Sequence, residues 1–211
     1  MRFIFATALS AGIVAALGSP VAAQVHGALS EAHVVPVNGR LGGAYVQFDR
    51  SSATLSGQLR LSFYPNLDFG FQGGLSRMTL IGATRTSVRL GADFRGQVAT
   101  QGPAFPVTVA LGGSIGVESA DNFTILSVGP QVVFSRKLDT AGNLIGYGGA
   151  SLLLSRYDVA GVRDTDTSFP VRAGLEIHAS PDLRLLAEAQ LAVSDAVRRV
   201  ASVTIGALFP F

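Results

Sequence analysis

Residues 203–211 read Val-Thr-Ile-Gly-Ala-Leu-Phe-Pro-Phe and end the sequence. One parity of this stretch holds only apolar side chains: Val203, Ile205, Ala207, Phe209 and Phe211. The other parity begins with Thr204 and Gly206. Because successive side chains of a strand point to opposite faces, this alternation predicts a β-strand with one face against an apolar medium.

Four residues of this stretch resemble the C-terminal signal of bacterial outer-membrane β-barrels. The matching positions, which are polar, glycine, hydrophobic and aromatic at the family's spacing, are Thr204, Gly206, Phe209 and Phe211. The resemblance implies that the barrel-assembly machinery recognises the segment while the closing strand inserts. Pro210 is a mild departure, because proline removes one backbone donor from a strand ladder.

Size and composition favour a single barrel domain over a helical membrane protein. The chain has 211 residues, no cysteine, 25 glycines and 14% charged residues, and its mean hydropathy is +0.40. Beyond the N-terminus, no apolar run approaches the ~18 residues that a membrane helix requires. Apolar residues spread over alternating strands are typical of a barrel in lipid. A formal net charge of +2 does not indicate a nucleic-acid partner.

The first 23 residues are predicted to be a cleaved secretory signal peptide. Arg2 supplies the positive start, residues 3–17 are mostly apolar, and Val21-Ala22-Ala23 forms a small-residue cleavage site. These residues are therefore excluded from the fold prediction.

Residues 24–39 are predicted to form a periplasmic lead-in to a barrel at residues 40–211. The segment is polar and irregular and ends in a Pro36-Val37-Asn38-Gly39 break. Its His26 and His33 have no further ligand-type residues at metal-binding spacing, so we expect neither a metal site nor a cofactor.

The clearest hairpin lies at residues 54–64 and 67–76, where apolar and polar residues alternate on both sides of Pro65-Asn66. Proline and asparagine favour a tight turn between the two strands. Further strands are predicted at 88–98, 107–118, 122–136, 144–157, 169–178, 183–191 and from about Arg199, with one more after Arg40. Pro130, inside one of these strands, predicts a bulge or a change of parity.

Turn-forming pairs recur at intervals of about 40 residues, which indicates a repeated hairpin. The pairs are Pro65-Asn66, Pro103-Ala104, Ala141-Gly142 and Pro181-Asp182. Polar loops are expected between them, near residues 50–52, 78–84, 119–122, 161–167 and 194–198. We therefore predict an all-β fold, an antiparallel up-and-down transmembrane β-barrel of ten strands with both chain ends on one side. Eight strands are the alternative if one weak pair is misassigned.

The polar parity of the predicted strands carries charges of both signs in near balance. They are Arg60, Asp68, Arg89, Asp93, Arg95, Arg172, Glu176, Arg184 and Glu188. Pairing across a narrow lumen would offset the cost of removing such charges from water. A water-facing exterior would favour lysine instead, and Lys137 is the chain's single lysine. We therefore expect the apolar parity to face lipid; a soluble periplasmic ligand-binding barrel is the alternative.

One short pattern suggests hydrolytic catalysis. His178-Ala179-Ser180, with Glu176 or Glu188 nearby, resembles the His-x-Ser element of outer-membrane lipid A deacylases. The resemblance implies a serine nucleophile activated by histidine and oriented by glutamate. Ser180, however, directly precedes the Pro181-Asp182 turn on the expected periplasmic side, whereas lipopolysaccharide would be hydrolysed at the outer leaflet. The sequence favours a protein that is not an enzyme, with lipid hydrolysis as the alternative.

Residues 40–211 as a whole resemble the small outer-membrane β-barrels of the porin-like or OmpA-type family. The resemblance implies location in the bacterial outer membrane, contact with its lipid and lipopolysaccharide, and a structural or narrow-pore role. With eight strands, side chains fill such a lumen, whereas ten strands allow a thin water path.

Overall fold

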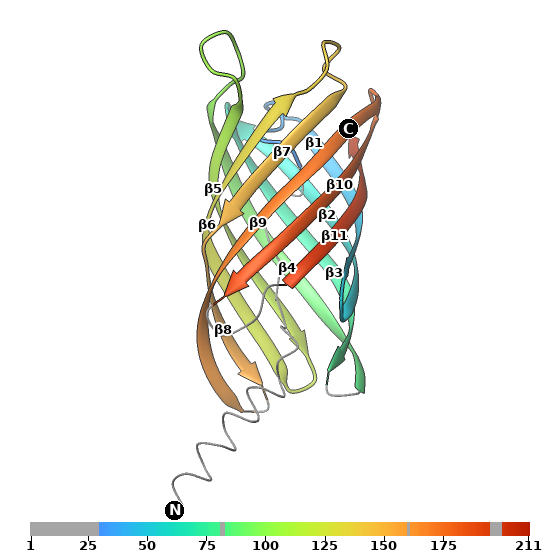
Figure 1. Ribbon diagram of the computed structural model, residues 1–211, viewed down its shortest axis with the longest axis vertical. Coiled ribbons are helices and arrows are strands. Elements are labelled where there is room, and N and C mark those ends of the chain that lie inside the picture. The colour runs from blue at the N-terminus through green and yellow to red at the C-terminus, as the bar shows by residue number, and fades with distance from the viewer. Residues whose placement is uncertain (1–29, 81–82, 160, 195–199) are drawn as a thin grey trace, which may run out of the picture.

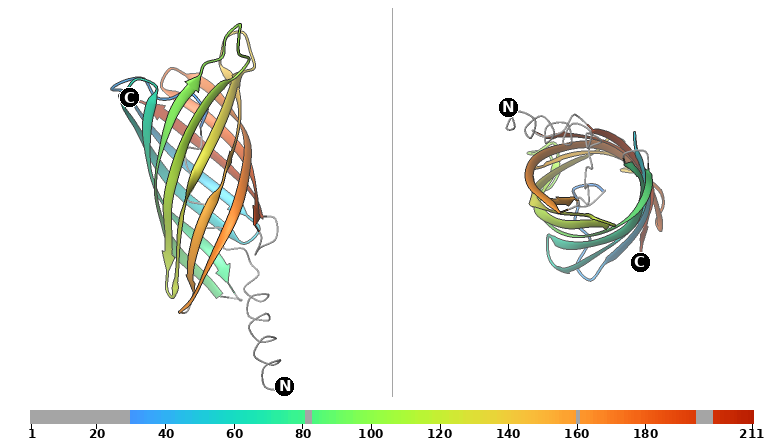
Figure 2. Two further views of the ribbon diagram at one scale, coloured as in Figure 1. Left: turned by 90° about the vertical axis from the view of Figure 1, so that its left-hand side faces the viewer. Right: turned by 90° about the horizontal axis from the view of Figure 1, so that it is seen from below.

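The computed structural model describes residues 30–80, 83–159, 161–194 and 200–211. The predicted signal peptide lies outside these residues. Antiparallel strands close into a single tilted barrel (Figures 1 and 2). Within the described part of the chain, no helix is long and apolar enough to cross a membrane.

The strands follow one another along the chain and pair mainly with their sequence neighbours. They are β1 (Arg40–Asp49), β2 (Ser52–Tyr64), β3 (Leu67–Leu80), β4 (Ala83–Ala99), β5 (Thr108–Ala120), β6 (Phe123–Lys137), β7 (Leu144–Ser151), β8 (Leu153–Val159), β9 (Val162–Ser180), β10 (Leu183–Ser194) and β11 (Val200–Pro210). The barrel closes because β1 also pairs antiparallel with β11, with Tyr45 opposite Gly206. The C-terminal strand predicted from the alternation at residues 203–211 is thus the closing strand.

β7 and β8 are two parts of one strand, because both lie between β6 and β9. The predicted barrel of ten strands is therefore confirmed. The interruption lies opposite Pro130, whose missing N–H removes a ladder donor. Gln131 faces Ser151 and Val128 faces Leu154, so equal numbers of residues separate these pairs on the two strands. The expected bulge or change of parity at Pro130 is wrong: the ladder is interrupted without a shift of register.

The two ends of the barrel differ in their connections. We call the end that holds the C-terminus and the Pro65-Asn66 and Pro181-Asp182 turns the turn end, and the opposite one the loop end (Figure 1). Asn66 adopts φ 58° in its turn, a left-handed conformation that asparagine tolerates well. The tight turns expected at Pro65-Asn66 and Pro181-Asp182 are therefore confirmed.

Two of the polar loops expected at the loop end are wrong. β3 continues to Leu80 and β4 begins at Ala83, so most of residues 78–84 is strand, with Thr79 opposite Thr84. Likewise, β9 begins at Val162 and includes residues 162–167 of the loop expected at 161–167. Residues 78–84 read Met-Thr-Leu-Ile-Gly-Ala-Thr and are mostly apolar, whereas residues 162–167 are polar but include one valine and two threonines, which favour extended backbone. Cross-strand pairing continues the ladder in both segments. The loop expected at 194–198 lies almost entirely outside the described residues.

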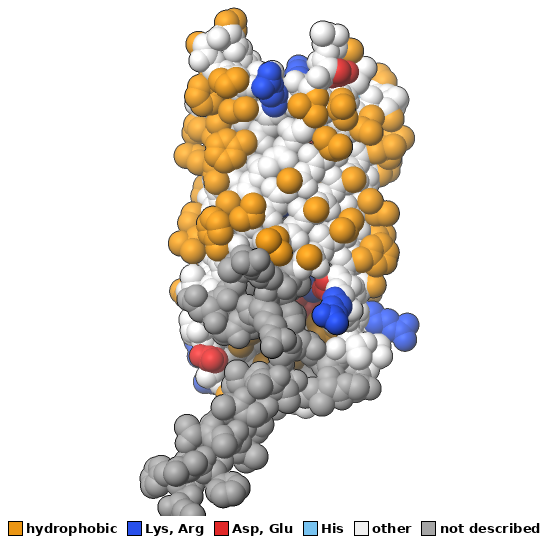
Figure 3. All heavy atoms as spheres, viewed as in Figure 1, with side chains coloured by type: hydrophobic (Ala, Val, Ile, Leu, Met, Phe, Trp, Pro, Cys, Tyr) orange, Lys and Arg blue, Asp and Glu red, His pale blue; other side chains and the backbone are white. Residues whose placement is uncertain are grey.

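The outer wall carries the apolar parity of the strands. Leu59 is 38% exposed, Phe71 51%, Leu90 55% and Leu185 44%. In the view of Figure 3, hydrophobic side chains are spread over the wall, and the charged ones appear near the two ends. The apolar residues thus surround the barrel, and the opposite parity fills its interior.

Candidate functional site

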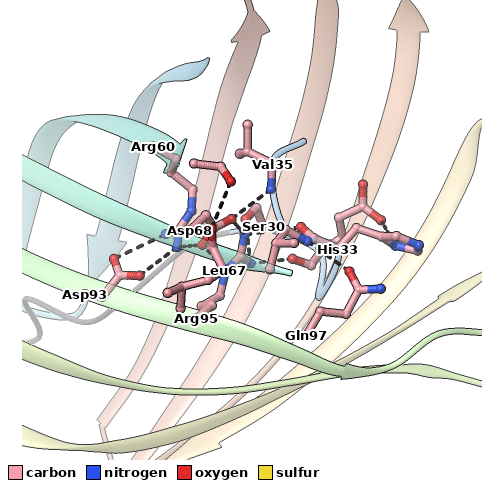
Figure 4. Close-up of polar contacts among 12 residues, drawn as sticks. Ser30, His33, Val35, Arg60, Leu67, Asp68, Asp93, Arg95 and Gln97 are labelled. Atoms are coloured by element: carbon pink, nitrogen blue, oxygen red, sulfur yellow. Dashed lines mark hydrogen bonds and ion pairs between the residues drawn. The ribbon is translucent and has the colours of Figure 1, made fainter. Parts of the chain in front are cut away.

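A network of two arginines and two aspartates occupies the lumen near the turn end (Figure 4). Arg60 of β2 donates to Asp68 of β3 and, over 2.8 Å, to Asp93 of β4. Arg95 of β4 donates to the other Asp68 oxygen over 3.0 Å. Gly70 of β3 lies opposite Arg60 of β2 and Asp93 of β4, and a Cβ on Gly70 would meet Asp93 Oδ2 at 2.3 Å and Arg60 Nη1 at 2.6 Å. The missing side chain of Gly70 therefore leaves the space in which the network forms.

Residues 30–35, which we call the lumen segment, lie inside the barrel at this end (Figures 2 and 4). Arg95 donates to the carbonyl oxygens of Glu31 and His33 and, over 3.2 Å, to Ser30 Oγ. The expected lead-in at residues 24–39 therefore includes a part that the charged lumen wall binds.

The barrel wall also holds the last residues of the lumen segment through their backbone amides. The Val34 amide donates to Gln97 Oε1 over 3.2 Å, and the Val35 amide donates to Asp68 Oδ2 over 3.0 Å. The fully buried Ala32 packs in the same lumen against Ala110 of β5 and Val133 of β6. Both polar and apolar contacts therefore fix the segment.

Glu31 is the centre of a second charged cluster on the opposite side of the segment. Its amide donates to Glu176 Oε2 over 3.2 Å, and Arg184 of β10 donates to its carboxylate over 3.2 Å. His33 Nδ1 lies 2.9 Å from Glu31 Oε2, and His178 Nε2 lies 3.8 Å from Glu31 Oε1. Arg184 also donates to Glu176 Oε1 over 3.1 Å. Arg184 and His178 of the wall thus lie beside the Glu31 carboxylate, the single carboxylate of the lumen segment.

Two opposing effects set the pKa of Glu31. Burial alone would raise it, but the hydrogen bond and charge of His33, together with the charges of Arg184 and His178, outweigh burial and lower it. The docked segment therefore stabilises the ionised carboxylate relative to a segment released into water.

This lowered pKa predicts that the lumen segment becomes loosely held in acid. Since the docked pKa lies below the ordinary value of 4.5, the charge contributes fully above that value and is lost as pH falls through the lowered pKa. The groups that face Glu31 are His33, Glu176, His178 and Arg184, with Arg95 on its carbonyl.

We therefore expect the Val34 and Val35 amides to exchange hydrogen faster below pH ~4.5, after correction for the intrinsic pH dependence of exchange. Mass spectrometry of the exchanged protein measures this. In Glu31→Gln the exchange should be fast already at neutral pH and show no acid step. An equal acid step in both proteins would contradict the assignment to Glu31.

Two further pairs of polar side chains line the lumen. Arg172 of β9 donates to Gln131 of β6 over 3.0 Å, and the buried Glu188 of β10 lies beside Tyr147. Towards the loop end, Arg89 and Glu118 form an ion pair at 3.0 Å. Charged groups therefore extend along much of the lumen.

All nine charged residues expected in the lumen lie on the inward parity, and Arg184, whose side chain is 26% exposed, is the least buried. The structure brings Arg60, Asp68, Asp93 and Arg95 together, and separately Glu176 and Arg184. The sequence analysis missed Glu118, although its inward parity could have revealed it. It also missed Glu31 and assigned no role to His33, because no periodic signal exists in this segment.

Proteins similar to this chain were found among solved structures only. No protein-family model and no curated protein matches the chain. The OmpT outer-membrane protein of Vibrio cholerae is similar with a TM-score of 0.38 and 12% identity, covering 76% of this chain and 56% of that one. The outer-membrane protease OmpT of Escherichia coli gives 0.48 and 10%, covering 87% and 100%. The KdgM porin gives 0.41 and 8%, covering 81% and 99%.

These similarities concern the fold, and the chain spans little more than half of the length of Vibrio cholerae OmpT. The ten strands close with apolar residues outside and charged residues inside. The chain has the fold of a small outer-membrane β-barrel.

The four residues that resemble a C-terminal assembly signal take up distinct positions in the barrel. Thr204 is buried and faces the lumen, whereas Phe209 and Phe211 are exposed on the wall. Gly206 lies under the ring of Tyr45: a Cβ on Gly206 would meet Tyr45 Cδ1 at 2.3 Å. Gly206 is thus required by packing, independently of any recognition during assembly.

The arrangement expected for catalysis does not form at His178. Its Nε2 lies 3.1 Å from Glu176 Oε1 and also faces Glu31. Among the described residues, Ser180 makes no hydrogen bond to this ring and lies exposed at the end of β9. His178 therefore belongs to the charged cluster that holds the lumen segment.

The same cluster contains three residues of types that can bind a metal ion, and it is the one such group found among the described residues. Ligand atoms of Glu31, Glu176 and His178 lie within 4.8 Å of one another. Arg184, however, donates to both carboxylates and already supplies the positive charge that a metal ion would provide. The arrangement is therefore an ion-pair network between segment and wall.

Proposed function

We propose that the protein is an integral β-barrel of the bacterial outer membrane with a narrow, porin-like lumen and no enzymatic activity. The observation that carries this proposal is the polarity of the wall. Leu55 is 61% and Leu75 54% exposed, whereas Arg60 and Asp68 are fully buried. In water, such a wall would leave a large apolar surface exposed, and a hydrocarbon layer would bury it. A soluble ligand-binding barrel would need the opposite arrangement.

Polar groups inside the barrel support a lumen that water can reach. The buried amide nitrogens of Gln58, Gln72 and Gln131 have no hydrogen-bond partner among the described residues. Buried amides are normally satisfied by protein groups or by water, so these positions favour hydration. The lumen charges are largely paired, which favours passage of small ions with weak selectivity.

Membrane fractionation combined with gel electrophoresis in detergent tests the location. We expect the mature protein in the outer-membrane fraction, with a gel mobility that changes on boiling because the closed barrel resists detergent. Planar bilayers then test the pore through discrete conductance steps. Recovery from the aqueous fraction would contradict the membrane location, and a complete lack of steps would leave a structural role.

A further inference from the structure

We propose that the lumen segment, residues 30–35, is a gate that closes the lumen at the turn end and opens when the contacts of Glu31 are broken. This inference rests on the proposed pore function and adds its regulation. The segment precedes β1 and is not part of the barrel wall.

The contacts of the segment reach strands all around the barrel. Val35 packs in one cluster with Tyr45 of β1, Leu208 of β11 and Tyr147 of β7. The same Val35 donates to Asp68 of β3, and Ala32 packs against β5 and β6. Together with the Glu31 contacts to β9 and β10, these interactions span the lumen rather than one side of it. A solute moving along the axis would therefore meet the segment.

The segment is held by side chains of the wall and not by strand pairing. Its amides at Glu31, Val34 and Val35 donate to side-chain oxygens. Backbone pairing with the barrel begins only at Asn38, whose amide donates to Ser62 O over 2.9 Å. Release therefore breaks no hydrogen bond of the barrel ladder, and the barrel remains closed through β1 and β11.

Residues 36–39 form a tight connection between the segment and β1. Asn38 adopts φ 62°, and the Gly39 amide donates to Pro36 O over 2.8 Å. A Cβ on Gly39 would meet Pro36 O at 2.8 Å. This fixed turn defines where a moving segment is attached, at the rim of the turn end.

Glu31 is the group on which release depends most. It is the only carboxylate among residues 30–35, and it meets Arg184 and His178 of the wall together with its neighbour His33. The remaining polar contacts of the segment use its amides, carbonyls and the Ser30 hydroxyl. Loss of the Glu31 charge therefore removes the ion pairs between the lumen segment and the wall and leaves the turn at residues 36–39 intact.

A single cysteine provides a direct measure of release, because the chain contains none. Ala32 is 0% exposed, so a thiol at Ala32→Cys reacts with a water-soluble maleimide only when the segment leaves the lumen. We expect Glu31→Gln to raise the labelling rate about tenfold or more, the effect of losing a charge-assisted hydrogen bond. Asp158→Asn, which changes an exposed carboxylate at the loop end, is the matched control and should leave the rate unchanged.

A disulfide between Ala32→Cys and Ala110→Cys should hold the segment in place, because these residues pack together. In planar bilayers, we expect few or no steps from the oxidised protein and frequent steps after reduction in the Glu31→Gln background. Ala32→Cys alone, with and without reductant, controls for effects of the reductant.

The labelling and conductance measurements test the gate proposal and the pore proposal separately. An unchanged labelling rate in Glu31→Gln would overturn the gate, whatever the conductance. Equal conductance of the oxidised and reduced proteins would overturn the gate while the pore proposal stands. Fast labelling without conductance in any state would overturn both, and leave a mobile segment in a structural barrel.

Discussion

Replacing Asp68 by alanine is expected to lower the free energy of unfolding by about 3–5 kcal/mol, the usual effect of removing one partner from a buried ion pair. Asp68 is fully buried and contacts Arg60 and Arg95, which are 0% and 1% exposed. After the replacement, Arg60 keeps Asp93, but Arg95 has no carboxylate among its described contacts. A buried guanidinium without a counter-charge destabilises the fold, because desolvation of its charge is no longer compensated.

Urea titration of the barrel in lipid vesicles measures this loss, with far-UV circular dichroism as the signal since the chain has no tryptophan. The matched control is Asp158→Ala, which breaks an Arg163–Asp158 pair of similar geometry at 2.9 Å. The side chains of that pair are 68% and 40% exposed, so the loss should stay below about 1 kcal/mol. Equal effects of the two replacements would show that burial of the Asp68 network contributes little.

Gly206→Ala is expected to destabilise the barrel by about 1–3 kcal/mol, the range for adding a carbon to a fully packed site. In most extended positions this change is neutral or stabilising, because alanine reduces the entropy of the unfolded chain. Here the added Cβ would lie 2.3 Å from Tyr45 Cδ1 and 2.8 Å from Ala44 O. Tyr45 cannot easily move, since it is 2% exposed and its hydroxyl donates to Gln58 Oε1 over 2.9 Å. The clash lies at the β1–β11 seam, so barrel closure should suffer most.

Gly57→Ala is the control for Gly206→Ala, because its added Cβ meets only Gly43 O, at 3.6 Å. A double-mutant cycle with Tyr45→Ala then separates packing from recognition. If Gly206 is needed for packing, its replacement should cost much less once the Tyr45 ring is absent. An equal assembly defect in both backgrounds would instead indicate that the assembly machinery reads Gly206 itself. Refolding in vesicles without that machinery measures the packing effect alone.

Much of the barrel could be predicted because the alternation of apolar and polar residues along a strand indicates which side chains face lipid and which face the lumen. In β2, Leu55, Leu59 and Arg60 already show by parity which side chains face out and which face in. The Pro65-Asn66 turn was predictable because proline and asparagine determine turn geometry without distant contacts. The loop predicted at residues 78–84 is wrong because Met78, Thr79 and Leu80 favour extended backbone and pair with β4 across the hairpin.

Parity also indicated the buried charges but not their partners. Arg60 and Asp93 lie on different strands, with β3 between them, and meet only because Gly70 leaves room. Arg89 and Glu118 face each other across the β4–β5 pair, which requires knowledge of the register. Composition alone gives charge balance, whereas pairing depends on strand order and register.

The amino-acid sequence by itself determined the alternating strands, their turns and the chemical character of each face, since these properties depend on neighbours along the chain. Only the closed barrel decided that residues 30–35 enter the lumen and that Glu31 meets Glu176, 145 residues away. The segment has no periodicity of its own, and its position follows from side chains that different strands bring to one end. Closure of β1 on β11 creates the interior in which these charges are desolvated, and desolvation makes their pairing necessary.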